Sequence, residues 1–230
     1  MDYRLMVKGL QENMDVLKHL DDYERIRERL RIRMLNPERN SERLRNLAVL
    51  PFLDLAVTFA VMVSEMEHHC ALIRVTSELF SSWNVTAEQV LKDALENERR
   101  DGAYRLDNIL DVVKKLYDEN SGLSGQMPDD SLMKGERMYV ISEKSSCNGS
   151  AAILMNDLLQ GFSEVFEGDF LILPSSVNEL ICVRDHSELD YNYIRSVVEQ
   201  VNDAAVPDDE ILSYSVYRYS RCHDSVSIVA

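Results

Sequence analysis

The segment between Leu173 and Leu180 brings together the side chains that are best suited to chemistry. Two serines, an asparagine and a glutamate follow a proline there: Ser175, Ser176, Asn178 and Glu179. Hydroxyl, carboxamide and carboxylate groups at a strand end could bind a small molecule, and a serine beside a base could act as a hydrolase nucleophile. No GxSxG sequence, which exposes the nucleophile in α/β-hydrolases, surrounds these serines. The alternative is a hairpin turn whose proline and serines satisfy local backbone groups.

The histidines and cysteines do not follow a metal-binding pattern. His68, His69 and Cys70 are neighbours, but adjacent side chains on an extended chain point to opposite faces and chelate one ion poorly. HExxH, close-set cysteine pairs and the phosphate-binding GxGxxG and GxxxxGKS/T sequences are all missing. We therefore expect no metal and no cofactor, and we assign no catalytic residue.

Arginine is concentrated near the N-terminus. Between residues 21 and 45, eight arginines and six acidic residues give a net charge of +2, whereas the whole chain carries −15. On a helix, Arg25, Arg29 and Arg33 would share one stripe, and this Arg-rich segment, 24–45, could bind phosphates or an acidic protein surface. Acidic residues three and four positions away offer salt-bridge partners. The pattern favours docking on the acidic remainder of the chain, on a second copy or on another protein over binding to nucleic acid.

The composition is that of an acidic globular protein of 230 residues, 45% of them hydrophobic. Its net charge favours solubility and opposes nonspecific binding to nucleic acid or to an anionic membrane. The N-terminal sequence lacks the apolar core of a signal peptide, and no run of about 18 apolar residues occurs. We therefore expect a cytoplasmic protein with reduced cysteines and no membrane association.

The apolar periodicity of the first half predicts helices followed by a hairpin. Apolar residues spaced by three and four predict a helix over 15–35, and a shorter helix follows over 41–50. Two β-branched apolar runs across a polar turn predict a hairpin over 54–76. Three further helices and a glycine-rich loop are predicted at 77–83, 87–98, 106–118 and 120–136.

The second half repeats the order of hairpin and helix. The Asn148–Gly149 pair predicts a hairpin over 138–155, followed by a helix over 156–166. Strands then follow at 170–174, 179–185, 214–221 and 225–230, and a helix follows at 190–203. We predict an α+β fold with a mixed or antiparallel sheet built from two β-hairpin–helix units, either duplicated or similar by coincidence, with helices packed on one side. A helical N-terminal region, 1–50, would precede this α+β body, 51–230.

Four segments carry a resemblance to a known family. They are PFLDLAVTFAVMV (51–63), NGSAAILMNDLL (148–159), FLILPSSVNELICV (170–183) and VEQVNDAAVPDDEILSYSVYRYSR (198–221). With them the chain resembles an uncharacterised bacterial family, domain of unknown function 5688, over about residues 20–221. It departs from the family pattern at Asn178, where a histidine is usual, and at Ser213–Tyr214–Ser215, where Ser-Asp is usual. Family members carry a further N-terminal region, so the resemblance implies a shortened member, a fold and a bacterial host, but no reaction.

These observations lead to one expected function and two alternatives. The charge asymmetry and the lack of a catalytic signature predict a non-enzymatic protein-interaction domain, whose partner is another protein or a second copy. One alternative is a small-molecule-binding or hydrolase-like domain centred on the turn at 174–179. The other is nucleic-acid binding through the Arg-rich segment.

Overall fold

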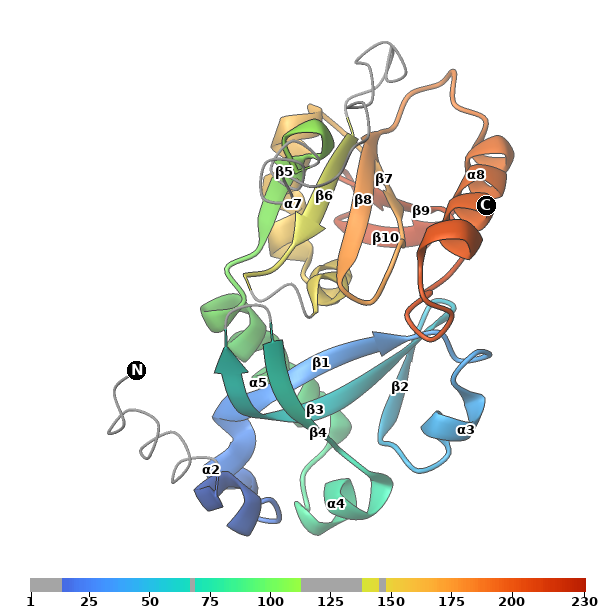
Figure 1. The fold of residues 1–230 in the computed structure, drawn as a ribbon. Helices are drawn as coiled ribbons and strands as arrows, with labels where there is room; N and C mark the ends of the chain where they lie inside the picture. Colours follow the sequence, from blue (N-terminus) through green and yellow to red (C-terminus); the bar gives the residue numbers. More distant parts are fainter. Residues whose placement is uncertain (1–13, 67–68, 113–137, 145–147) are drawn as a thin grey trace, which may run out of the picture.

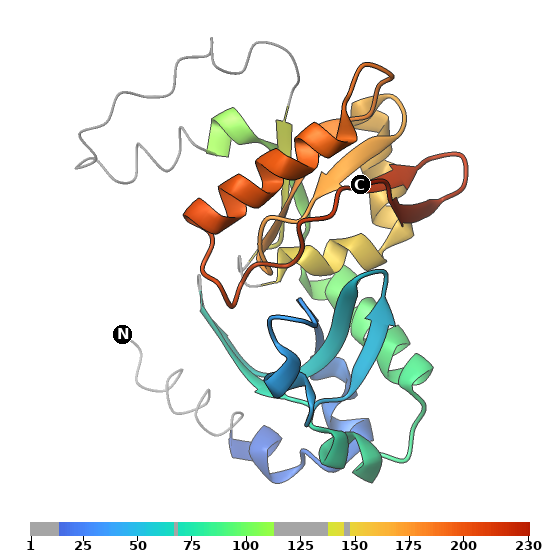
Figure 2. The same cartoon turned by 90° about the vertical axis from the view of Figure 1, so that its right-hand side faces the viewer.

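The computed structural model describes residues 14–66, 69–112, 138–144 and 148–230. Its strands form two antiparallel sheets, one of four strands and one of six. The four-stranded sheet lies below the six-stranded sheet in the view of Figure 1, and Figure 2 shows the same order from the side. The predicted α+β class is confirmed, although the strands divide into two sheets where a single sheet was expected.

The long strand β3 (Leu55–Met66) is the centre of the first sheet. β1 (Leu30–Leu35) pairs along one edge of β3, and β2 (Val49–Phe52) and β4 (His69–Arg74) follow one another along the other edge. Every residue of β3 from Leu55 to Met62 is buried. A continuous apolar strand of this kind is expected where both faces of a sheet are covered.

Short helices and one long helix surround the first sheet. They are α2 (Tyr23–Ile26), the 3-10 turn η1 (Arg27–Arg29), α3 (Ser41–Leu44), α4 (Ser77–Ser82) and α5 (Ala87–Asp101). Thr86 caps α5 by accepting a hydrogen bond from the Gln89 backbone, as its sequence predicts. The Asn97 side chain donates to the Leu30 carbonyl of β1 at 3.1 Å, so α5 is attached to the edge of the sheet.

The second sheet has the strand order β10-β9-β7-β8-β6-β5. Its strands are β5 (Arg105–Asn108), β6 (Met138–Ser142), β7 (Phe170–Leu173), β8 (Glu179–Arg184), β9 (Tyr217–Ser220) and β10 (Ser225–Ile228). The 3-10 helix η3 (Gly149–Leu154) and α7 (Asn156–Phe166) cover one face, and α8 (Tyr191–Ala205) lies on the other (Figure 1). Helices therefore pack on both faces, not on one.

Two apolar clusters fill the space between these layers. The larger one continues from Phe59 of the first sheet through Ile153 of η3 to Phe170 and Tyr217 of the second. The smaller one lies beneath α8 and contains Leu171, Leu173, Val183, Val198 and Val216. Because strand side chains alternate between faces, β7 and β8 contribute to both clusters.

The predicted helix over 15–35 is helical over residues 15–18 and 23–26, but it is wrong at its end, because residues 30–35 form strand β1. Leu30, Ile32 and Met34 are spaced by two as well as being part of a helical pattern, and all three are fully buried against β3. The helix predicted over 41–50 is limited to α3, and β2 takes its last residues. The region 1–50 is therefore not purely helical, while the division of the chain at residue 50 stays a prediction.

The second predicted hairpin is also wrong. β6 pairs with β5 and β8, and residues 149–154 form η3 where a strand was expected. The backbone of Gly149 donates to the Asn178 carbonyl, which holds this segment against the turn at 174–179. Of the two predicted β-hairpin–helix units, only the first, β3–β4–α4, is present, so the apparent repeat does not correspond to two equal structural units.

The other predicted elements agree with the structure. The hairpin over 54–76, the helices over 77–83 and 87–98, and the later helices and strands are confirmed within a few residues. The predicted helix over 106–118 begins instead as strand β5, and residues 109–112 are helical. The predicted loop at 120–136 lies outside the described residues.

A buried carboxylate joins the two sheets. Glu98 on α5 is 2% exposed, and its Oε1 accepts hydrogen bonds from the Ile32 backbone at 3.0 Å and from Asn148 Nδ2 at 2.9 Å. Its Oε2 accepts from the Tyr104 hydroxyl at 3.0 Å. Burial raises the pKa of Glu98, and the hydrogen bonds and nearby Arg31 oppose that rise.

Glu98 should make the protein less stable as pH rises. Because its folded pKa lies above its unfolded value, the native state binds more protons than the unfolded state just above pH 4.5. Glu98→Gln removes this ionisation. The free energy of unfolding of the variant, relative to that of wild type, should therefore increase from pH 4 to pH 7 by at most about 1.4 kcal/mol per pH unit. Urea unfolding measures the difference. The exposed Glu96→Gln on the same helix is the control, and equal pH profiles for all three proteins would contradict the expectation.

Candidate functional site

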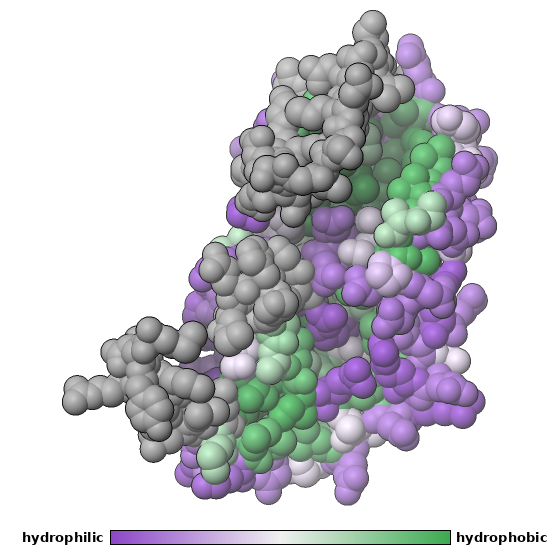
Figure 3. Space-filling view, in the orientation of Figure 1, coloured by the Kyte–Doolittle hydropathy of each residue, from purple (hydrophilic) through white to green (hydrophobic). Residues whose placement is uncertain are grey.

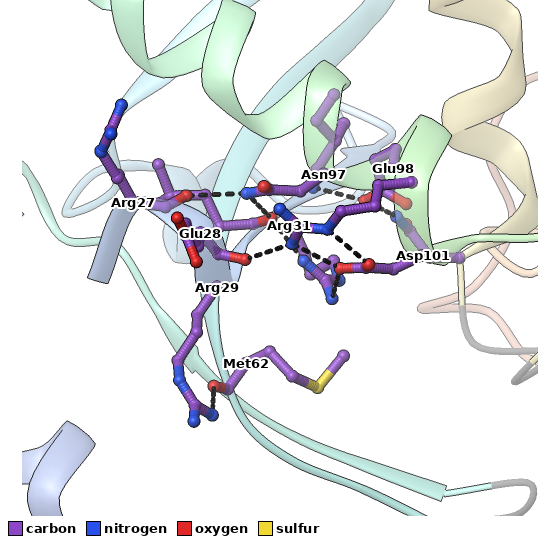
Figure 4. A network of polar contacts seen from close by, with 12 residues as sticks. Arg27, Glu28, Arg29, Arg31, Met62, Asn97, Glu98 and Asp101 are labelled. Carbon is purple, nitrogen blue, oxygen red and sulfur yellow. Dashed lines mark hydrogen bonds and ion pairs between the residues drawn. The ribbon is translucent and has the colours of Figure 1, made fainter. Parts of the chain in front are cut away.

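The arginines near the N-terminus are used inside the fold. Arg31 is 9% exposed, and its guanidinium donates to Asp101 at 2.8 Å and to the Leu30 carbonyl (Figure 4). Arg29 points the other way and donates to the Met62 carbonyl at 3.5 Å. These contacts tie β1 to α5 and the 3-10 turn η1 to β3.

The helical stripe that would align the three candidate arginines is not formed. Arg25 lies on α2, Arg29 in η1 and Arg33 on β1. Arg25 makes an ion pair with Asp22 at 3.2 Å. A partner-binding role for these arginines stays a prediction, but the shared helical stripe on which it was based is not present.

Two later arginines dock on the acidic part of the chain. Arg39 pairs with Asp208 and lies over the Tyr214 ring, with its guanidinium carbon 5.4 Å from the ring centroid. Arg43 pairs with Asp209 at 3.9 Å. These contacts join the segment between β1 and β2 to the segment after α8. They agree with the expectation from the charge asymmetry that arginines of the Arg-rich segment contact the acidic remainder of the chain.

Residues 174–177 of the turn at 174–179 are buried, Asn178 and Glu179 are half-buried, and the turn makes many hydrogen bonds. Ser176 is 7% exposed, and its hydroxyl accepts a hydrogen bond from the Asn178 backbone at 3.1 Å. The Ser150 hydroxyl donates to the Val177 carbonyl at 2.7 Å, and the Val177 backbone donates to the Glu210 carbonyl at 3.1 Å. Ser176 therefore stabilises the turn, as in the hairpin-turn interpretation.

An apolar groove of about 370 Å³ lies between α8 and the second sheet. The sheet supplies Leu171, Leu173, Ile181 and Val183, and the helix supplies Ile194, Val197, Val198 and Val201. Figure 3 shows hydrophobic surface along the side of the molecule where α8 faces β8. We name this feature the α8 groove.

Polar side chains gather at the end of the α8 groove nearest the turn. Ser175 lines the groove and is 8% exposed, and its hydroxyl has no hydrogen-bond partner in the described part of the chain. Asn202 of α8 donates to the Pro174 carbonyl at 3.1 Å and to the Ser213 carbonyl at 3.3 Å. Asn202 thus fixes the helix to the turn.

Glu179 stands at the same end. As the first residue of β8 it shares a face with Ile181 and Val183, which line the α8 groove. Burial raises the pKa of Glu179, and no ion pair to its carboxylate occurs among the residues with described positions. Asn178 instead donates to Glu210 Oε2 at 3.2 Å. Of the four candidate residues, Ser175 lines the groove, and Glu179 lies outside the lining but on the same face of the sheet. Ser176 and Asn178 hold the turn.

The α8 groove is lined by apolar side chains and by the polar Ser175 and Asn202. No histidine is among the described residues that line the α8 groove, so Ser175 lacks the base that a serine nucleophile normally uses. Within the described ranges, no three histidine, cysteine or acidic side chains are grouped as metal ligands. None of the described helices is both long enough and apolar enough to span a bilayer.

The comparison with known families decides the relationship of the chain. A family model described as a family of unknown function (DUF5688) matches residues 4–221. The chain belongs to this family. No curated protein and no solved structure matches this chain.

Three of the four segments that carry the resemblance to DUF5688 meet at the turn, namely 148–159, 170–183 and 198–221. Gly149 and Ser150 bond it from one side, and Glu210 bonds it from the other. At one departure from the DUF5688 pattern, Ser213 and Ser215 donate to Asp54 of the first sheet at 2.6 and 2.9 Å. The resemblance segments are therefore concentrated where the two sheets and α8 come together.

Sequence reasoning found the turn of this DUF5688 member but missed the groove. The sequence signal that could have indicated the groove is the apolar stripe formed by Tyr193, Val197 and Val201, which are spaced by four within the helix predicted over 190–203. A stripe of this spacing normally faces a core. Here Val198 and Asn202 take that position, and the stripe is left at the mouth of the groove.

Gly149→Ala should test how tightly the turn is packed. A methyl group at Gly149 would lie 2.2 Å from the Asn178 carbonyl oxygen, so we expect a loss of stability of about 1–3 kcal/mol. The control is Gly161→Ala in α7, where the added methyl meets nothing within 4 Å and should stabilise the helix by roughly 0.5–1 kcal/mol. Urea denaturation of both variants checks this, and a neutral Gly149→Ala would show that the turn can move.

Proposed function

We propose that this DUF5688 member is a non-enzymatic, cytoplasmic interaction module whose α8 groove receives an apolar segment of another protein. The observation that carries this proposal is the exposed stripe at the mouth of the groove. Tyr193 is 67% exposed, Val197 39% and Val201 47%, and all three are continuous with the apolar walls. Contiguous exposed apolar surface of this kind is a common mark of interaction sites.

The shape of the site favours a polypeptide segment over a compact ligand. The stripe from Tyr193 to Val201 covers eight residue steps, or about 12 Å of helix. A helix with apolar residues at the matching spacing would cover that length and place side chains in the groove. A compact ligand would fill the groove and leave the outer part of the stripe exposed.

A small-molecule ligand is the second candidate function. The groove volume of about 370 Å³ lies within the range of ligand pockets, and the Ser175 hydroxyl gives a polar group that could orient such a ligand. Nucleic-acid binding has less support, because Arg31, Arg39 and Arg43 are engaged with acidic side chains of the chain itself.

The proposal is tested with a peptide probe and a pair of matched variants. The probe is a fluorescein-labelled, N-acetylated 15-residue peptide with Leu at helical spacing and Gln elsewhere. Val201→Asp places a charge at the mouth of the groove, and Val165→Asp on α7 is the control, because Val201 and Val165 are 47% and 51% exposed. Fluorescence polarisation should show saturable binding to wild type and to Val165→Asp, and at least about tenfold weaker binding to Val201→Asp, because an unpaired carboxylate is costly in an apolar contact.

Two results would contradict the proposed function. One is the absence of binding to wild type at peptide concentrations up to the millimolar range. The other is equal affinity of the two Asp variants, which would place the peptide elsewhere on the surface. Both substituted positions are solvent-exposed, so far-UV circular dichroism should be unchanged and should exclude unfolding as the cause.

A further inference from the structure

We infer that the segment received by the α8 groove carries a lysine or arginine at one end of its apolar face, and that this cation is recognised by Glu179 with help from Ser175. The inference rests on the proposed function and names the chemistry of the partner. It concerns the end of the groove nearest the turn, which we call the polar end.

The positions of the two side chains follow from strand alternation. Leu171 and Leu173 of β7 line the groove, and Ser175 continues that row into the turn and also lines it. Ile181 and Val183 of β8 line it from the neighbouring strand, and Glu179 is the next residue on their face. Since the turn joins these two strands, Ser175 lies at the polar end, and Glu179, which is outside the groove lining, lies next to that end on the same face.

Both side chains lack the partners that comparable groups have in this fold. The buried Asp185 carboxylate, 6% exposed, is 2.7 Å from the Arg218 guanidinium. The buried Glu98 carboxylate accepts three hydrogen bonds. Glu179 has neither an ion pair nor a side-chain hydrogen bond among the residues whose positions are described, although burial disfavours its charged form.

The Ser175 hydroxyl is the second, independent sign of a ligand. It belongs to a residue that is more than nine-tenths buried and that lines the groove, and it makes no hydrogen bond within the described chain. Polar groups in such positions are normally paired, because leaving them unpaired costs free energy. A hydroxyl oxygen can accept a hydrogen bond from an ammonium or a guanidinium group.

The surrounding charge also selects a cation. Glu210 lies beside the turn and is bonded there by the uncharged Asn178, so that contact leaves its negative charge in place. The whole chain carries −15. A lysine or arginine at the polar end would supply the missing charge-assisted hydrogen bonds, whereas an acidic residue would add repulsion.

Three peptides with the same Leu positions test the inference. One carries Lys at the end of its apolar face, one Gln and one Glu, and binding is measured by fluorescence polarisation at 0.15 M salt to limit long-range attraction. For wild type we expect the Lys peptide to bind roughly tenfold more tightly than the Gln peptide, and the Glu peptide to bind most weakly. Glu179→Gln should reduce the Lys preference to about twofold or less while leaving the affinity of the Gln peptide unchanged.

Matched variants separate this site from the general charge of the protein. Glu164→Gln on α7 removes one negative charge from an exposed position elsewhere and should preserve the Lys preference. Ser175→Ala should weaken binding of the Lys peptide by a few fold, in line with one lost hydrogen bond. Analytical ultracentrifugation of the free protein tests the other occupant, a second copy: self-association abolished by Val201→Asp would assign the groove to that copy and overturn the inference.

The two proposals fail in different ways. If none of the three peptides binds wild type, the proposed function is wrong. If all three bind with equal affinity, or if the Lys preference survives Glu179→Gln, the groove binds apolar segments but the cation site is wrong.

Discussion

The hydrogen bonding of the turn at 174–179 is the constraint on which the second sheet and the α8 groove depend. A buried turn must pair its backbone groups, and this one finds partners in three separate segments. Ser150 bonds the Val177 carbonyl, Glu210 accepts from the Val177 backbone, and Asn202 donates to the Pro174 carbonyl. Each contact positions a different element, namely η3, the segment after α8, and α8 itself. The width of the groove is therefore set at the turn, because Asn202 fixes the C-terminal half of α8 there.

Local pattern predicted the elements whose own sequence decides their structure. The hairpin over 54–76, the capped helix α5 and the strands around the turn follow from β-branched runs, a Thr86 cap and turn residues, and all of them are present. β1 could not be read in this way, because the apolar residues from Ile26 to Met34 suit both a helix and a strand. Pairing with β3 decided in favour of the strand, and that information lies about 25 residues further along the chain. Residues 149–154 became η3 for a similar reason, since the bonds that hold them come from the turn at 174–179.

The candidate site was predicted in part, and the limit has the same origin. The types of residue in the turn pointed to polar chemistry, but their sequence could not tell which side chains the turn uses for itself. Ser176 and Asn178 bond within the turn or to Glu210, while Ser175 lines the groove and Glu179 shares the face of β8 that carries it. The groove needs α8 and the sheet together, so it exists only in three dimensions. The arginines show the reverse case: in a cluster that is conspicuous in the sequence, three of the eight arginines pair with Asp101, Asp208 and Asp209 of the chain itself.

Glu98 and Glu179 show why buried charge alone does not identify a binding site. Burial raises the pKa of both carboxyl groups. Around Glu98 the fold supplies a backbone amide, a carboxamide and a hydroxyl, so the cost of burial is offset within the protein and the group serves to join the two sheets. Around Glu179 the described chain supplies no such donor, and the neighbouring Ser175 hydroxyl is unpaired as well. The fold thus satisfies the buried Glu98 fully, whereas the half-buried Glu179 lies without a partner in the described chain on the face of the sheet that carries the α8 groove.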